Sequence, residues 1–242
     1  MKQTTLTVTE NTRLADGIYR LRLAGDTSAI TAPGQFVNLK LSGFFLRRPI
    51  SVCDWENGEL TLIYKVLGHG TEAMTGMAPG TELDVLTGLG NGYDVSRSGE
   101  HPLLVGGGVG IPPLYGLAKR LTAQGKRVTA VLGFNRESEI FLAEEFRALG
   151  VEVIIATADG SAGLKSGLAG SGGQGVDVLH EVEDCGQCIG GVQVVVHRGA
   201  ELALGLLGLL LQALVGAELG LAEGEVEVLA AGVEALEAVL AA

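Results

Sequence analysis

The sequence predicts a small β-barrel or sandwich, followed by an α/β domain built on a parallel sheet. In the first part of the chain, short stretches alternate between apolar and polar residues, with turn dipeptides such as Asn57-Gly58 between them, which is typical of antiparallel strands. In the second part, apolar runs alternate with helical patterns, the order that a parallel sheet requires. After Lys165 the composition changes, and we expect that C-terminal segment to be helical where it is structured.

Five stretches near the N-terminus have the period-two alternation of half-buried strands. Turn signals such as Pro33-Gly34 and Pro79-Gly80 separate them. Several short strands with turns between them indicate a closed or two-layered all-β unit, which we place at residues 1–100. The five stretches are Thr5–Thr9, Ile18–Leu23, Gln35–Leu41, Leu60–Val66 and Thr81–Leu86.

Residues 101–165 predict the start of an α/β domain. Three apolar stretches with strand character are separated by two stretches with apolar residues at helical spacing. Ligands of such parallel sheets bind at the carboxyl ends of the strands. The five elements are strands at Leu103–Val105, Arg127–Phe134 and Val151–Ala156 and helices at Pro112–Ala123 and Glu139–Leu149.

Composition and charge exclude several classes of protein. The chain has 242 residues, 47% of them hydrophobic, and a formal net charge of −11, so a nucleic-acid surface of clustered Lys and Arg is excluded. Three cysteines are too few for a disulfide scaffold. The N-terminus has no apolar signal region, and the apolar stretch Leu202–Ala217 is shorter than the roughly 20 residues that span a bilayer. We therefore expect a cytoplasmic protein.

The composition breaks near Lys165. Only Arg198 among the Lys and Arg residues follows it, and Ala, Gly, Leu, Val and Glu make up most of the remainder. We treat residues 166–242 as a divergent segment, and hypothesise that this terminus is divergent, frameshifted or artificial.

A glycine turn separates the first strand of the α/β domain from its helix. Gly106, Gly107, Gly108 and Gly110 precede two prolines, and proline suits the first turn of a helix. Glycines let the backbone approach a phosphate or a flat ring closely, and a helix N-terminus favours negative charge. The dinucleotide pattern G-x-G-x-x-G is absent, because Ile111 stands at its last position. The alternative interpretation is a tight turn found in any α/β protein.

Three short motifs in the β part also suit a phosphorylated ligand. Arg48 offers a planar fork that can bind a pyrophosphate at two points, and Ser51 can hydrogen-bond to a ring. The stretch Ile63-Tyr64-Lys65 could lie along a flat ligand, and the turn Gly68–Thr71 suits a phosphate. The alternative for Arg48 is an ordinary surface arginine before a strand-edge proline.

These motifs, taken in order and spacing, resemble the electron-transfer subunits of NAD-dependent dihydroorotate dehydrogenases, a branch of the ferredoxin-reductase-like flavoproteins. The resemblance covers residues 1–165. It implies a FAD-binding β-barrel, a nicotinamide-binding α/β domain and a [2Fe–2S] cluster near the C-terminus. It also implies a heterotetramer with an FMN-containing catalytic subunit that oxidises dihydroorotate to orotate in pyrimidine biosynthesis. The motifs are Arg48–Ser51, Ile63–Lys65, Gly70-Thr71, Gly88–Gly92, Gly106–Pro113, Val131–Phe134 and Ala156–Ser161.

The resemblance assigns cofactor contacts by position. Arg48 is expected at the phosphates of FAD and Ser51 near its isoalloxazine ring. Residues 63–65 are expected along the flavin and ribityl chain, the turn at residues 70–71 at the pyrophosphate, and the turn at residues 106–110 at the nicotinamide nucleotide. The implied cofactor-binding residues are Arg48, Pro49, Ile50, Ser51, Ile63, Tyr64, Lys65, Gly70, Thr71, Gly106, Gly107, Gly108 and Gly110.

The cluster motif of the family is incomplete. A [2Fe–2S] site takes four thiolates, and only Cys185 and Cys188 lie in the C-terminal region, flanked by His180 and His197 without a standard metal-site spacing. Two alternative functions therefore stay open: an NAD(P)H flavin oxidoreductase that needs no cluster, and a non-catalytic remnant of the fold. The electron acceptor and the choice between NADH and NADPH stay open as well.

Overall fold

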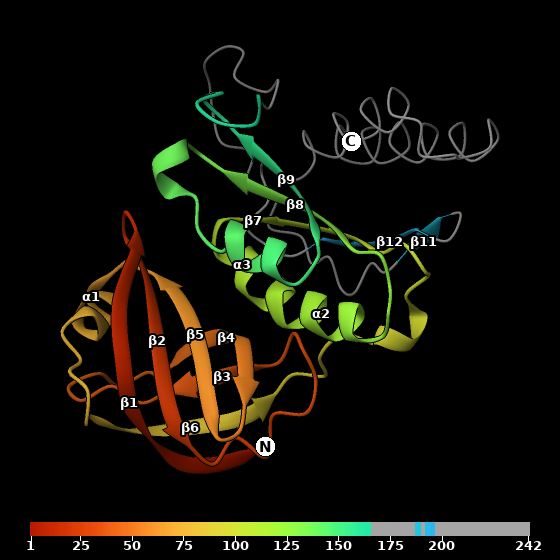
Figure 1. Cartoon of the computed structure of the whole chain (residues 1–242). Helices are drawn as coiled ribbons and strands as arrows, with labels where there is room; N and C mark the ends of the chain where they lie inside the picture. The colour runs from red at the N-terminus through yellow and green to blue at the C-terminus, as the bar shows by residue number, and fades with distance from the viewer. Residues whose placement is uncertain (166–186, 190–191, 197–242) are drawn as a thin grey trace, which may run out of the picture.

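A computed structural model describes residues 1–165, 187–189 and 192–196 of the chain. It contains a closed six-stranded barrel and a separate six-stranded sheet (Figure 1). The prediction of a β-barrel followed by a parallel-sheet unit is therefore confirmed. The barrel elements are β1 (Lys2–Ala15), β2 (Ile18–Gly25), β3 (Phe36–Leu39), β4 (Arg48–Glu56), β5 (Glu59–Lys65), α1 (His69–Thr75) and β6 (Glu82–Leu89).

The barrel closes in the order β1-β2-β5-β4-β3-β6, and every pair of neighbouring strands is antiparallel. Alternate residues of each strand point into a core of aliphatic side chains, as the period of two requires. Leu6, Leu21, Leu39 and Leu62 are completely buried there. This core holds the strand ends in place at the rim of the barrel.

Strand β4 changes its partner halfway along. Its first half pairs with β3, from Arg48 opposite Leu39 to Ser51 opposite Phe36. Its second half pairs with β5, from Val52 opposite Leu62 to Glu56 opposite Glu59. β3 and β5 lie on opposite edges of β4, and on the β5 side no ladder pair of the described strands extends beyond Val52 and Leu62, so the first half of β4 and the last residues of β5 diverge without pairing.

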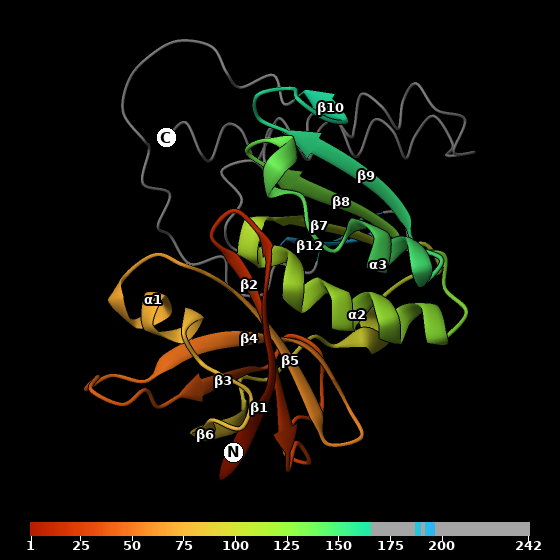
Figure 2. The same cartoon turned by 60° about the vertical axis from the view of Figure 1, so that its left-hand side comes forward.

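The second sheet has the order β10-β9-β8-β7-β12-β11 and is parallel except for the pair β11–β12. The helices α2 and α3 lie on the same face of this sheet, and α2 lies between the sheet and the barrel (Figure 2). The elements are β7 (Leu103–Gly107), α2 (Ile111–Ala123), β8 (Thr129–Phe134), α3 (Ala143–Ala148), β9 (Glu152–Thr157), β10 (Leu164–Lys165), β11 (Gln187–Ile189) and β12 (Val192–Val196).

Helix α2 docks directly on β4. At Gly116 a Cβ atom would lie 2.8 Å from the carbonyl oxygen of Cys53, so only glycine allows this approach. Three residues later, the Nζ of Lys119 lies 2.8 Å from Asp54 and 2.9 Å from Glu56. Partial burial lowers the pKa of Lys119, but the hydrogen bonds that its ammonium donates to these two carboxylates outweigh burial and raise the pKa above its ordinary value. The ammonium therefore stays charged and links the two parts of the molecule.

Two local predictions need correction. The helix expected at Glu139–Leu149 begins only at Ala143, because Leu142 adopts a left-handed conformation with φ of 63°. The preceding Phe141 instead packs edge-on against Phe134 of β8, at 5.6 Å between ring centroids. The turn expected at Gly68–Thr71 is the first turn of α1. In both places tertiary packing overrides the local pattern.

Of the C-terminal segment predicted to be helical, the described part forms the two strands β11 and β12, and β12 extends the sheet beside β7. The apolar stretch Leu202–Ala217 lies outside the described residues. Among the residues that the structure does describe, no helix is both long enough and apolar enough to cross a membrane.

We predict that Gly116→Val lowers the melting temperature of the protein. The added side chain would press on the backbone of β4, and such overpacking costs about 1–3 kcal/mol. The matched control is Arg120→Val, which places the same β-branched residue at an exposed position of α2. Circular dichroism melts of both variants measure the difference. Helix propensity alone would favour Gly116→Val over Arg120→Val, so a melting temperature of Gly116→Val no lower than that of the control would contradict the role of the contact with Cys53.

Candidate functional site

The predicted flavin-binding segments lie opposite each other where β4 and β5 diverge. Val52 pairs with Leu62, so continuing this register places Ser51 opposite Ile63 and Pro49 opposite Lys65. No ladder pair joins these residues within the described part of the chain. The two strand edges therefore present backbone groups that a ligand can use, and such groups are seldom left without partners.

The two adjacent arginines at this edge have different roles. Arg47 is paired with Asp84, at 2.9 Å between Nη2 and Oδ2, and it also donates to the carbonyl oxygen of Asp84 at 3.0 Å. The hydrogen bond from Arg47 holds the pKa of the Asp84 carboxyl below its ordinary value. Arg48 is half-buried and has no carboxylate partner among the described residues. Its positive charge is therefore available to an anion from outside the chain.

Gly70 brings the start of α1 against Arg48. A Cβ atom at Gly70 would lie 2.1 Å from Nε of Arg48, so the backbone of the helix and the guanidinium group are in close contact. The Thr71 hydroxyl accepts hydrogen bonds from the backbone N–H groups of Leu67, at 2.9 Å, and Gly68, at 3.3 Å. It ties the preceding loop in place. The structure thus brings together the predicted phosphate-binding residues from β4 and α1.

Tyr64 points into the barrel. Its ring is 1% exposed, its hydroxyl donates to Oδ1 of Asn11 at 3.3 Å, and it stacks on Tyr19 at 5.7 Å between centroids. Only the backbone of Tyr64 therefore lies at the diverging strand edges. Ile63, on the other face of β5, packs in the same apolar cluster as Ile111 of α2.

The glycine turn lies next to β5. Its last residues form a 3-10 turn, Gly108–Gly110, which contacts both β5 and the carboxyl end of β7. Gly106 leaves no room for a side chain, because a Cβ there would lie 2.7 Å from Leu114. No side chain caps the N-terminus of α2, where Pro112 and Pro113 carry no N–H group and the N–H of Ile111 donates to the carbonyl oxygen of Gly108. The predicted nicotinamide turn and the predicted flavin strand are thus neighbours.

Comparison with known proteins shows the family. No family model matches the chain. A protein of Bacillus pumilus (strain SAFR-032), named dihydroorotate dehydrogenase B (NAD(+)), electron transfer subunit, is 46% identical over 173 residues, which cover 68% of this chain and 67% of that protein. A protein of the same name from Geobacillus sp. (strain WCH70) is 44% identical over 189 residues, which cover 75% and 70%. The chain belongs to this family. The resemblance expected from the motifs is therefore confirmed.

Solved structures show how this chain relates to a wider fold. The structure of an NADH-dependent reduced ferredoxin-NADP oxidoreductase is 30% identical, has a TM-score of 0.60, and the match covers 66% of this chain and 59% of that one. A ferredoxin NADP+ reductase from Neisseria gonorrhoeae, with bound FAD and NADP, has a TM-score of 0.60 at 17% identity and covers 68% and 73%. The second likeness concerns the fold alone. The fold class is ferredoxin-reductase-like, as the sequence predicted.

The structure describes one of the two cysteines, Cys185 and Cys188, that were candidates for cluster ligands. Cys185 lies outside the described residues, and Cys188 lies in β11. Cys53 is 1% exposed, in the core between β4 and α2, and burial raises the pKa of its thiol. In the described ranges, no three His, Cys, Asp or Glu side chains gather as metal ligands.

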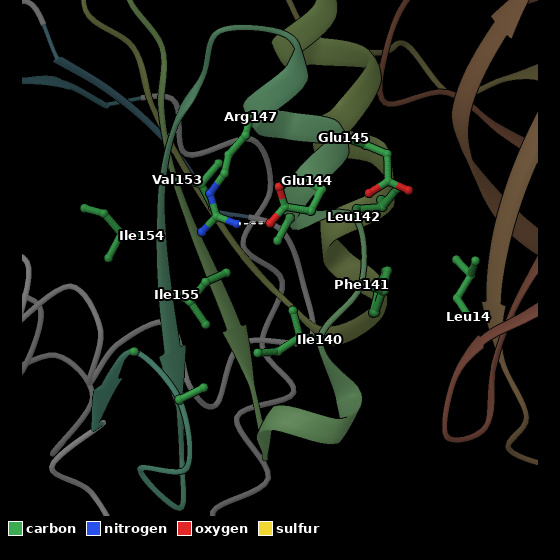
Figure 3. A pocket seen from close by; sticks show the side chains of 13 residues that line it. Leu14, Ile140, Phe141, Leu142, Glu144, Glu145, Arg147, Val153, Ile154 and Ile155 are labelled. Atoms are coloured by element: carbon green, nitrogen blue, oxygen red, sulfur yellow. Dashed lines mark hydrogen bonds and ion pairs between the residues drawn. The ribbon is translucent and has the colours of Figure 1, made fainter.

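A cavity of about 900 Å³ lies away from the diverging strands. It is bordered by Leu14 at the tip of the β1–β2 hairpin, by α3 and by β9, and Glu144 pairs with Arg147 at its edge (Figure 3). It contains none of the predicted cofactor-binding residues. The candidate site therefore lies at the barrel edge and not in this cavity.

Two residues of the site did not emerge from the sequence. Asn11 orients Tyr64 and also donates to the carbonyl oxygen of Met74 in α1, at 2.8 Å. Phe44 lies under Arg48, with 5.0 Å from the guanidinium carbon to the ring centroid. Phe44 stands four residues before Arg48, and this spacing only weakly indicates a contact. Asn11 lies on a strand far from Tyr64 in the sequence. Neither position could be assigned without the fold.

We predict that the hydroxyl of Tyr64 ionises at a higher pH than that of an exposed tyrosine. Burial raises the pKa of Tyr64 from 10.0 to about 12. Because the folded pKa lies above the unfolded one, the stabilisation is complete below pH 10 and is lost as pH rises through 12. The difference between absorbance titrations at 295 nm of the parent and Tyr64→Phe is expected to be centred near pH 12. The variant is also expected to lose less stability between pH 10 and 12. A difference centred near pH 10 would place the ring in solvent.

Proposed function

We propose that this protein carries electrons from NADH, through a bound FAD, to an FMN-containing subunit that oxidises dihydroorotate. One observation supports this most directly: Arg48 lies at the edge between diverging strands without a carboxylate partner in the described part of the chain, while its neighbour Arg47 is paired with Asp84. The names of the relatives, and the membership of the chain in their family, support the same function.

The residues present fit a flavin dinucleotide. Arg48 would bind the pyrophosphate with two N–H groups, and the backbone around Gly70 and Thr71 would approach the phosphates from the other side. Ser51 and the backbone of residues 63–65 would hydrogen-bond to the polar edge of the ring, because the edges on which β4 and β5 face each other are unpaired there, while their other edges pair with β3 and β2. Pro49 and Ile50 would form the wall between ring and pyrophosphate. The barrel, residues 1–100, is thus proposed as the FAD-binding unit.

The glycine turn at residues 106–110 would bind the nicotinamide nucleotide. The backbone around Gly108, where a Cβ atom would meet nothing within 4 Å, would let a phosphate approach the turn that Gly106, Gly107 and Gly110 complete. The contact of this turn with β5 would bring the two ring systems within reach. FAD, when bound, supplies a ring that accepts a hydride and passes its two electrons on singly. We propose that residues 101–165 begin this nicotinamide-binding unit.

The residues do not fit a [2Fe–2S] cluster held by this chain alone. Such a cluster takes four thiolates, and the sequence has three cysteines, of which Cys53 is buried in the core. We therefore propose no electron path through a cluster in this chain. The proposed partner is the catalytic subunit, in a heterotetramer located in the cytoplasm, in agreement with the low cysteine content.

We predict that Arg48→Ala weakens FAD binding about ten- to a hundredfold. The lost hydrogen bonds involve charged groups, and such bonds are worth about 1.5–3 kcal/mol. Fluorescence titration of the apoprotein with FAD measures the affinity. Arg120→Ala, which removes a positive charge from an exposed position of α2, serves as the control and is expected to bind FAD like the parent. Equal affinity of Arg48→Ala and the parent would contradict the assignment.

We predict that the purified protein is yellow and that NADH bleaches its flavin absorbance without air. The bleached protein is expected to reduce the FMN of the catalytic subunit when the two are mixed. A colourless protein that takes up no added FAD would refute the proposed function. A flavin that NADH reduces but that passes no electrons to the catalytic subunit would favour the cluster-free flavin oxidoreductase instead.

A further inference from the structure

In the part of the chain that the structure describes, three contacts restrict the side chain of Arg48. Its Nη1 donates to the carbonyl oxygen of Leu46 at 2.7 Å. The backbone of Gly70 lies against Nε and Nη2. The ring of Phe44 lies beneath the guanidinium group, at 5.0 Å from its central carbon to the ring centroid. None of the three contacts neutralises the positive charge. They therefore fix the orientation of the guanidinium group and leave its charge available to a ligand.

We propose that Phe44 is a positioning residue: it orients Arg48 for the diphosphate of the dinucleotide through a cation–π contact. This inference rests on the proposed function, because it takes FAD as the ligand of Arg48. The ligand class is a diphosphate with a planar, doubly charged binding edge, which a correctly turned guanidinium meets with two parallel hydrogen bonds.

Phe44 is suited to this role because it is itself anchored. Its side chain is half-buried and packs against the barrel core, whereas Phe45, the next residue, is 100% exposed. Leu46 is exposed as well, at 66%. Within this loop, Phe44 is thus the aromatic ring that the core holds in place. A ring fixed by the barrel can hold a long, flexible side chain that would otherwise sample many rotamers.

The contact acts before the ligand arrives. An arginine that is already oriented loses less conformational freedom when it binds, so the benefit appears as affinity for the diphosphate. The same ring does not reach the flavin end of the site through Arg48, since the guanidinium lies between Phe44 and Gly70. The effect of Phe44 is therefore specific to ligands that carry the diphosphate.

The test compares three substitutions by equilibrium titration of the apoprotein. Phe44→Leu keeps an apolar side chain but removes the aromatic face, and is expected to weaken FAD binding about three- to tenfold. Phe44→Tyr keeps the face and is expected to restore the parent affinity. Phe45→Leu makes the same exchange at the exposed neighbour and is expected to have no effect. Riboflavin, which lacks the diphosphate, is expected to bind the parent and Phe44→Leu equally.

A second measurement separates positioning from a general effect on the fold. Phe44→Leu is combined with Arg48→Ala, and in that background it is expected to change FAD affinity no further, because there is no guanidinium left to orient. Equal losses of Phe44→Leu in both backgrounds, or a loss of riboflavin affinity as large as that of FAD, would overturn the proposal. If the parent protein itself does not bind FAD, the proposed function fails. If the parent binds FAD and Phe44→Leu binds it equally, only the positioning role fails.

Discussion

The partner change of β4 is the constraint on which the site depends. β4 pairs with β3 along one edge as far as Ser51, and with β5 along its other edge only from Val52 onward, while β5 stays in the barrel wall through its pairing with β2 as far as Lys65. The backbone groups on both sides then need another partner. A barrel with all its strands paired to their ends would be equally well packed and would have no place for a flat ligand. The opening is thus a consequence of strand register and requires no strained residue.

Charge pairing decides what this opening can bind. The chain has an acidic balance, with a net charge of −11, and most cations of the described barrel lie beside carboxylates. Arg47 follows this rule and closes the β3–β6 side of the wall through Asp84. Arg48 departs from it. In the described barrel Arg48 has no carboxylate partner and lies against the glycine backbone of α1, so it favours a ligand with concentrated negative charge.

The docking of α2 on β4 brings the second binding segment to the first. Gly116 allows the helix to approach the backbone of Cys53, and Lys119 spans to Asp54 and Glu56. The N-terminus of the same helix carries the glycine turn, which contacts β5. One helix therefore sets both the spacing of the two units and the place of the turn, because a helix is rigid over its 13 residues. A hydride transfer between two ring systems needs such a fixed arrangement of their binding segments.

The sequence alone determined the fold class and the membership in a flavoprotein family, because strand alternation and glycine motifs are local properties, but it missed the strand β4 and the helix α1. It also placed Arg48, Gly70 and the turn at residues 106–110 among the candidate residues. It did not show that Tyr64 points into the barrel, that α3 begins only after Leu142, or that Phe44 lies under Arg48. Tertiary structure decided which of two adjacent arginines is free, because the carboxylate that pairs with Arg47 lies 37 residues away on β6. Contacts between distant strands leave no local pattern, so only the folded barrel could assign them.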